Sequence, residues 1–215
     1  MPKNYISNST DTPRMFKSDL LEPLSKVHFS VPLYIFLPTA VYCVYRDFAV
    51  EHAGVLTFIS YFILGVFVWT LTEYVMHRFV FHHTPHGKIQ ERIHFVFHGV
   101  HHDYPRDSKR LVMPPSVSIP LALLFYFLFK LILPSQGLFA FWPGFILGYL
   151  CYDMMHYAMH HYTFKQKFLK RIQQHHMIHH YQDPTRDFGV TSDLWDKVFH
   201  SQSVMKNKLT KAKAQ

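Results

Sequence analysis

The sequence contains few cysteines and lacks an N-terminal apolar run of the signal-peptide type. Only Cys43 and Cys151 occur in 215 residues, and both lie within apolar segments. This count excludes a disulfide scaffold and a metal site built from cysteine thiolates. The first 28 residues are polar and carry charges of both signs, so we expect no cleavable signal peptide. The length predicts a single domain, in which the cysteines are packing residues.

Acidic residues are also in the minority. The chain has 14 Asp and Glu against 22 Lys and Arg, which gives a formal net charge of +8. A basic balance suits nucleic acid, an acidic substrate or an anionic membrane surface. Here the bases fall in three blocks, 1–30, 78–110 and 165–213, and long apolar runs lie between the blocks. This pattern indicates a membrane protein, and we expect no nucleic-acid partner.

The apolar runs predict four membrane-spanning helices. Segment 29–45 is uncharged but contains two prolines, whereas 53–72 is uncharged and continues without a break to residue 83. The stretch 115–152 is too long for one crossing and is interrupted by Pro-Ser-Gln-Gly at 134–137, which favours two helices joined by a hairpin. We therefore predict an all-α integral membrane protein with four transmembrane helices.

Four crossings would bring both ends of the chain to the same face of the membrane. The regions expected on that face, 1–28, 77–112 and 156–215, contain 20 of the 22 Lys and Arg, which makes the face cytosolic by the positive-inside rule. The expected organisation is a cytosolic N-terminal arm over 1–28, a membrane-embedded domain over 29–200 and a basic C-terminal tail over 201–215.

Histidines are concentrated in four clusters beside the predicted spans. The clusters are His77 and His82; His98, His101 and His102; His156 and His160; and His176, His179 and His180. Residues three or four apart share a helix face, so each HxxHH segment should present three imidazoles to one side. Imidazole suits iron, zinc or copper, and ten imidazoles can bind two ions with about five each or slightly fewer. We interpret the clusters as a dinuclear metal site in a cytosolic, histidine-rich helical cap.

Two carboxylates lie close to these clusters in the sequence. Glu73 stands one helical turn before His77, and Asp153 stands three residues before His156. We expect both to support the ligands, by accepting the outer ring N–H and fixing the tautomer of an imidazole. The other histidines are not assigned to the ions: His28, His52 and His200 lie outside the clusters, and His83, His86, His94, His161 and His175 lie among the ligands without fitting the spacing. His94, four residues before His98, stays open.

Four segments of the chain resemble the fatty acid hydroxylase superfamily, and within it the fatty acid 2-hydroxylases that act on sphingolipid acyl chains. They are LTEYVMHRFVFH (71–82), HFVFHGVHHDYPRDSKRLVMPP (94–115), YDMMHYAMHH (152–161) and HHMIHHYQDPTRDFGVTSDLWDKVF (175–199). RLVMPP and FGVTSxxWD make the resemblance specific, because the histidine clusters alone are shared with sterol desaturase-like and carotenoid hydroxylase enzymes. The sequence departs from the family at His200, where members commonly have glycine after Trp-Asp-x-x-Phe.

The resemblance implies that the ten histidines bind two iron ions, which zinc can replace, and that the enzyme uses O2 to hydroxylate a lipid acyl chain at the carbon next to the carbonyl. Some members carry a cytochrome b5-like domain with a His-Pro-Gly-Gly motif, which this sequence lacks. We therefore expect electrons from a separate protein, a cytochrome b5 or a ferredoxin with its reductase.

Two other readings stay open at this point. One is a sterol desaturase-like or carotenoid hydroxylase-type lipid oxidase. The other is a histidine-rich metal transporter, although transport favours ionisable groups inside the spans and these histidines flank the spans. We expect the endoplasmic reticulum membrane in a eukaryote, where Lys211 and Lys213 resemble a dilysine retrieval signal, or the inner membrane in a bacterium.

Overall fold

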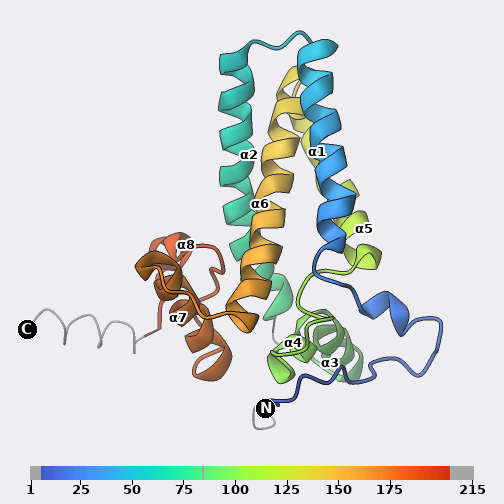
Figure 1. Cartoon of the computed structure of the whole chain (residues 1–215), viewed down its shortest axis with the longest axis vertical. Helices are drawn as coiled ribbons and strands as arrows, with labels where there is room; N and C mark the ends of the chain where they lie inside the picture. Colours follow the sequence, from blue (N-terminus) through green and yellow to red (C-terminus); the bar gives the residue numbers. More distant parts are fainter. Residues whose placement is uncertain (1–5, 84, 204–215) are drawn as a thin grey trace, which may run out of the picture.

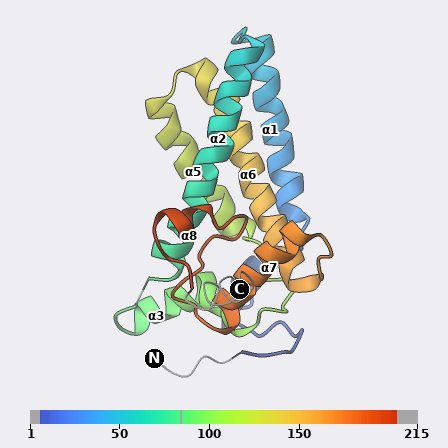
Figure 2. The ribbon, with the colours of Figure 1, turned by 90° about the vertical axis from the view of Figure 1, so that its left-hand side faces the viewer.

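The computed structural model describes residues 6–83 and 85–203, and every regular element in these ranges is a helix. The α-helices are α1 (Val31–Ala49), α2 (Val55–Val75), α3 (Lys88–His94), α4 (Val100–Asp103), α5 (Pro115–Ile132), α6 (Ser135–His161), α7 (Lys167–Tyr181) and α8 (Leu194–Val198). A 3₁₀ turn, η1 (Pro23–Ser25), and two π-helical segments, η2 (Met76–Phe81) and η3 (Phe95–Gly99), complete the set. The long helices α1, α2, α5 and α6 stand side by side, and the short helices gather at their lower end (Figures 1 and 2). The all-α prediction is thus confirmed for the described residues.

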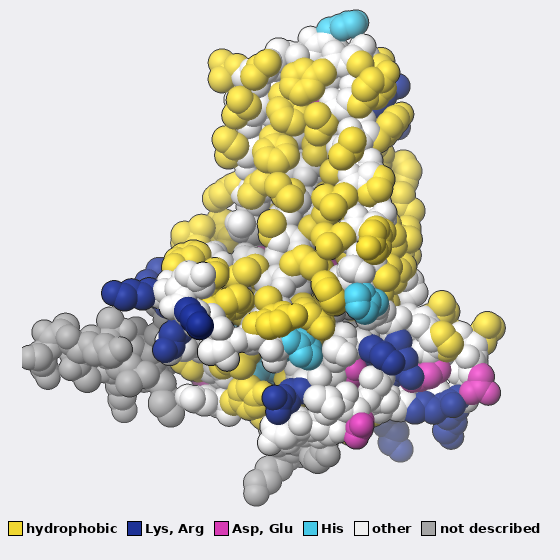
Figure 3. All heavy atoms as spheres, viewed as in Figure 1, with side chains coloured by type: hydrophobic (Ala, Val, Ile, Leu, Met, Phe, Trp, Pro, Cys, Tyr) yellow, Lys and Arg dark blue, Asp and Glu magenta, His cyan; other side chains and the backbone are white. Residues whose placement is uncertain are grey.

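Three of the long helices are apolar and long enough to cross a membrane. They are Val55–Phe81, with a mean hydropathy of 2.0, Pro115–Ile132 and Ser135–His161. The predicted first span forms as α1 but is not among the three, since Pro32 and Pro38 interrupt its apolar side chains and Arg46 and Asp47 occupy its end. Figure 3 shows hydrophobic side chains covering the column of long helices, with Lys and Arg around its lower end.

Helix α6 forms the centre of the column and packs against α1 and α2. Of the apolar window in α6, 72% is buried, against 11% in the α2 segment, so α6 is the core helix and α2 presents most of its surface outward. Two glycines permit close contact of the α2 and α6 backbones. A Cβ on Gly65 would lie 2.2 Å from the carbonyl oxygen of Phe141, and one on Gly144 would lie 2.1 Å from that of Phe62. Small residues commonly allow such close packing between membrane helices.

A π-helical segment explains the five-residue step from His77 to His82. Helix α2 continues beyond residue 72, as predicted, and passes into η2, where the His82 N–H donates to the His77 carbonyl at 3.1 Å. Hydrogen bonds from residue i+5 to residue i characterise a π-helix and bring residues five apart to the same side. The predicted hairpin is confirmed as well, because α5 ends at Ile132 and α6 begins at Ser135.

The structure describes most of the predicted N-terminal arm but only the first residues of the predicted C-terminal tail. The N-terminal arm is described from residue 6 and packs along the cap, as its hydrogen bond from Ser7 N–H to the Asp103 carbonyl shows. Most of the predicted tail, including Lys211 and Lys213, lies outside the described residues.

His200 has a left-handed φ of 53°. This conformation favours glycine, which gives a physical reason for the glycine that the family commonly has there.

Candidate metal centre

The structure brings the ten predicted histidines together as two groups of five. The first group is His77, His82, His98, His102 and His179; the second is His101, His156, His160, His176 and His180. Within each group the candidate ligand atoms all lie within 4.8 Å of one another. Each group therefore has the size and the donor set of a site for one metal ion.

Helical spacing decides which histidine joins which group. In each HxxHH segment the two residues four apart share a group, as His98 and His102 do, while the residue three after the first joins the other group, as His101 does. His179 likewise lies apart from His176 and His180. All three imidazoles of each segment thus belong to the two groups, but the spacing did not predict how they divide. Each HxxHH segment contributes to both groups and so ties them together.

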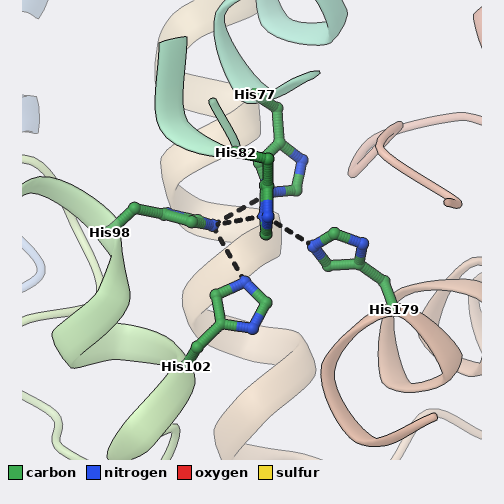
Figure 4. A group of neighbouring side chains, drawn as sticks. All are labelled: His77, His82, His98, His102 and His179. Atoms are coloured by element: carbon green, nitrogen blue, oxygen red, sulfur yellow. Dashed lines mark hydrogen bonds between the residues drawn. The ribbon is translucent and has the colours of Figure 1, made fainter. Parts of the chain in front are cut away.

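The five imidazoles of the first group converge through their Nε2 atoms (Figure 4). His82 Nε2 lies 2.9 Å from that of His179, 3.0 Å from that of His98 and 3.2 Å from that of His77. His102 Nε2 lies 3.0 Å from His98 Nε2. The rings come from η2 and the residue that follows it, from the η3 and α4 segment, and from α7, so three separate parts of the chain meet at this point.

Backbone carbonyls fix the tautomer of two of these rings. His77 Nδ1 bonds the carbonyl of Phe188, and His179 Nδ1 bonds the carbonyl of Arg186 at 2.6 Å. A carbonyl can only accept, so Nδ1 carries the proton in both rings and each Nε2 presents a lone pair. Lone pairs directed at a common point repel one another unless a cation lies between them. This donor set therefore fits a metal ion.

The second group is buried except for the partly exposed His160, and its rings have few hydrogen-bond partners of their own. Both ring nitrogens of His101, His156 and His180 are buried without a hydrogen-bond partner among the described residues. His160 Nε2 lies 2.9 Å from His176 Nε2. Buried polar atoms are ordinarily paired, because leaving one unpaired costs about 1–3 kcal/mol. Coordination of a metal ion would satisfy several of these nitrogens at once.

The electrostatics of the cap keep the imidazoles neutral. Burial, followed by the neighbouring histidines, lowers the pKa of His98, His102 and His180 well below 6.5. Burial likewise lowers the pKa of His179, to about 4. A neutral imidazole is the form that binds metals, because a protonated ring has no lone pair to offer.

A loop between α7 and α8 positions the first group, and the sequence analysis did not identify its organising residue. Asp196 Oδ1 accepts the N–H of Phe188 at 2.9 Å, and Asp196 Oδ2 accepts that of Gly189 at 2.8 Å. The same carboxylate pairs with the buried His175, whose other ring nitrogen lies 3.2 Å from Asp187. Asp196 thus holds the backbone that bonds His77. The FGVTSxxWD segment was the available signal for it.

Among the described residues, Glu73 accepts hydrogen bonds from Val190 and Thr191 and not, as the sequence analysis predicted, from a histidine ring. Its Oε1 accepts the N–H of Val190 at 2.7 Å and of Thr191 at 2.8 Å, and Oε2 accepts the Thr191 hydroxyl at 2.6 Å. Glu73 therefore acts on the same loop as Asp196 and supports His77 through the backbone. For Asp153, which is 1% exposed, no hydrogen bond to a histidine is found among the described residues.

The unassigned histidines lie outside both groups. His83 and His94 face each other, with ring centroids 5.8 Å apart, and His94 joins neither group. His175 is buried beside two carboxylates, and His28 accepts or donates a bond with the Ser30 hydroxyl at 2.8 Å. The structure therefore leaves all eight outside the two groups, including His94, which the spacing had left open.

The chain is similar in sequence to known proteins of one family. A family model for fatty acid hydroxylase matches residues 62–201. The chain is 39% identical over 197 residues to the ceramide very long chain fatty acid hydroxylase scs7 of Schizosaccharomyces pombe, covering 88% of this chain and 55% of that protein. It is 37% identical over 188 residues to the dihydroceramide fatty acyl 2-hydroxylase FAH1 of Arabidopsis thaliana, covering 87% of this chain and 78% of that protein.

A solved structure shares the architecture. Full-length scs7p, in which only the hydroxylase domain is visible, superposes with a TM-score of 0.81 at 38% identity, covering 86% of this chain and 70% of that one. Human fatty acid 2-hydroxylase is 38% identical over 209 residues, covering 87% of this chain and 56% of that protein. The chain spans about half the length of several relatives, with shares of 55%, 47% and 56%. By the extent of these matches, the chain belongs to the fatty acid hydroxylase family.

Proposed function

We propose that this protein is a membrane-bound di-iron oxygenase that uses O2 to hydroxylate a lipid acyl chain at the carbon next to the carbonyl. The observation that carries the proposal is the pair of five-histidine groups at the end of apolar helices in a member of this family. Replacing a C–H bond by C–OH is a two-electron oxidation, for which side chains carry no oxidant, and two bound iron ions would allow O2 to serve as the oxidant. The relatives named above as ceramide or dihydroceramide hydroxylases favour an N-acyl sphingolipid or fatty acid as substrate.

The chain's own residues would hold the ions and exclude water. We assign His77, His82, His98, His102 and His179 to one ion, and His101, His156, His160, His176 and His180 to the other. Burial of the imidazoles keeps them neutral, and the loop held by Asp196 and Glu73 fixes the direction of the His77 and His179 rings. Zinc prefers the same nitrogens, so zinc bound during expression is compatible with an iron enzyme.

We also propose that α1 crosses the membrane beside the three apolar helices, which gives four spans with the histidine cap on the cytosolic face. In support, α1 packs against α6, the core helix of the column. The domain then runs from 29 to 200, preceded by a cytosolic arm over 1–28. The location that follows is the endoplasmic reticulum membrane or a bacterial inner membrane. Electrons would come from a cytochrome b5 or a ferredoxin with its reductase.

Lipid mass spectrometry of the reconstituted enzyme tests the function. Iron-loaded protein given lipid and O2 should form product only when a reductase and electron carrier are added, and that product should be heavier by one oxygen. His179→Ala should abolish it, because the variant removes one of five converging donors. His86→Ala is the matched control, since His86 is exposed and lies in neither group.

Two results would change the assignment. A product lighter by two hydrogens would make the enzyme a desaturase. Full activity of the His179→Ala variant would contradict the metal site itself.

A further inference from the structure

A cavity of about 180 Å³ lies beside both histidine groups. A single water molecule requires only about 10–15 Å³ by the same kind of measure, so the cavity has room for a much larger guest. Its wall includes His98 of the first group and His101 and His156 of the second. Whatever occupies the cavity is therefore held against both candidate metal sites.

The rest of the wall is mostly apolar and comes from four parts of the chain, one of which is α6, with Tyr152 and Asp153. Phe81 and Phe97 belong to the two π-helical segments, and Val112, Met113 and Val117 belong to the start of α5 and the segment that leads into it. The last part is the N-terminal arm, whose lining residues are Met15, Phe16, Leu21, Leu24 and Ser25. A cavity with such walls suits a hydrocarbon chain, because burying apolar surface yields about 25 cal/mol per Å².

A buried ion pair holds the arm in place. Glu22 Oε1 lies 2.7 Å from Arg110 Nη2 and 2.8 Å from Lys26 Nζ, and Glu22 Oε2 accepts the N–H of Met15 at 2.9 Å and of Phe16 at 2.8 Å. The side chains of Glu22 and Arg110 are only 9% and 3% exposed. Burial alone would raise the pKa of Glu22, but these hydrogen bonds and charges hold it at about 2. The carboxylate thus stays charged and keeps the arm folded over the cavity.

Further bonds fasten the arm on both sides of Glu22. The Thr12 hydroxyl donates to Asp107 at 2.8 Å, and the Val27 N–H donates to the Lys109 carbonyl at 2.9 Å. Arg110 also bonds the carbonyl of Pro13. The stretch 12–27 is therefore attached at both ends to the same short segment, and the residues between the attachments lie against the cavity.

The arm also presents leucines to the outside. Leu20, Leu21 and Leu24 are 80%, 46% and 53% exposed. The Leu24 carbonyl accepts the Ser116 hydroxyl at 2.8 Å, which places Leu24 beside the first turn of the apolar helix α5. Exposed leucines next to a membrane-spanning helix are suited to the lipid interface. In Figure 1 this part of the arm, in dark blue, lies below the lower ends of α1 and α5.

We propose, building on the function proposed above, that arm residues 12–27 form the outer wall of the acyl-chain site and that Leu21 and Leu24 form its lipid-facing mouth. The guest is one acyl chain of a membrane lipid, which enters between the arm and α5 and reaches the histidines. The arm is in this way a specificity-determining element, because its side chains set the width of the site.

Photolabelling without turnover tests this inference. Zinc-loaded protein in lipid nanodiscs, without an electron donor, is exposed to a ceramide whose acyl chain carries a diazirine a few carbons from the carbonyl. Label in the peptide containing Met15 to Leu24, competed by unlabelled ceramide, is the expected result. Label confined to the outer faces of α5 and α6, with hydroxylation by the iron-loaded enzyme intact, would overturn the inference and leave the proposed function standing. Competed arm label without any hydroxylation would support the acyl site and count against the proposed function.

Variants of the arm sharpen the test. Glu22→Ala should reduce arm labelling at least several-fold, whereas Asp19→Ala should not, since Asp19 is an exposed carboxylate of the same arm that pairs with Arg14. Leu24→Trp provides a variant that leaves the ion pair intact and adds bulk at an exposed position lining the cavity. It should also reduce labelling, and equal labelling in all four proteins would overturn the inference.

Discussion

The Nε2 atoms of His82 and His179 lie 2.9 Å apart, although 97 positions separate the two residues in the chain. His82 directly follows the π-helical extension of α2, and His179 belongs to α7, so the approach of two helices far apart in the chain brings these nitrogens together. His179 bonds the Arg186 carbonyl through Nδ1, which leaves the lone pair on Nε2 directed toward His82. The approach of these two atoms is the structural basis of the metal assignment.

Metal content should follow the division into two groups. Purified wild-type protein is expected to hold two ions per chain. His179→Ala and His176→Ala each remove one donor from a different group, so each should lower the content toward one ion. Elemental analysis of the purified variants checks this. Wild-type protein that is active with one ion or fewer would contradict a dinuclear site.

The metal-free protein should lose stability in mild acid. An unfolded histidine has a pKa of about 6.5, whereas burial and neighbouring imidazoles lower the pKa of His176 and His180 well below that, and burial lowers that of His179 to about 4. Between these values the unfolded chain binds protons that the folded chain does not, so the free energy of unfolding falls as the pH falls. Thermal unfolding of the chelator-treated protein should therefore show a falling midpoint from about pH 7.5 to about pH 5. A constant midpoint over that range would refute the burial of neutral histidines.

Asp196→Asn should weaken metal binding without touching a ligand. The carboxylate accepts the N–H of Phe188 and of Gly189. In asparagine one of the two oxygens becomes an NH2 group, which donates and cannot accept, so one of these backbone N–H groups would lose its acceptor. Because the Phe188 carbonyl orients His77, we expect the metal affinity to fall by about 10- to 100-fold. Competition with a chelator measures the affinity. Asp193→Asn, which alters a nearby carboxylate paired with Arg171 and Lys197, should leave the affinity close to that of the wild type.

Gly144→Val should destabilise the helix column. The new side chain would meet the Phe62 backbone, so α2 and α6 would have to separate. Overpacking of this kind costs about 1–3 kcal/mol. Thermal unfolding in detergent is the measurement, with Gly54→Ala as control, because a Cβ at Gly54 meets its nearest neighbour only at 3.9 Å. Equal stability of Gly144→Val and the wild type would mean that the two backbones are not in close contact.

The sequence allowed the ten histidines to be selected, because their spacing of three or four on a helix is visible without a structure. It did not reveal how they divide, since His101 follows His98 by one turn and yet joins the other group. The same limit applies to supporting residues. Glu73 bonds Thr191 across 118 positions, and Asp196 bonds His175 across 21, so only the folded loop brings these groups together.

Hydropathy correctly predicted the helices whose residues are uniformly apolar. It gave a weaker prediction for segment 29–45, which contains prolines and is followed by charged residues. Segments 53–72 and 115–152 formed the expected helices. Helix α1 formed too, but its prolines and its Arg46 and Asp47 keep it outside the three apolar spans. The N-terminal arm was predicted only as a polar segment, because its attachment to Arg110 depends on contacts between parts of the chain 88 positions apart.

The central claim is tested most directly by giving the iron-loaded enzyme, with its reductase and electron carrier, a ceramide substrate under isotopically labelled O2. Our account predicts a product that gains one labelled oxygen on the acyl carbon next to the carbonyl, which tandem mass spectrometry locates, and predicts none from the His179→Ala variant. A product that lacks the labelled oxygen, or an unchanged yield from that variant, would contradict the account.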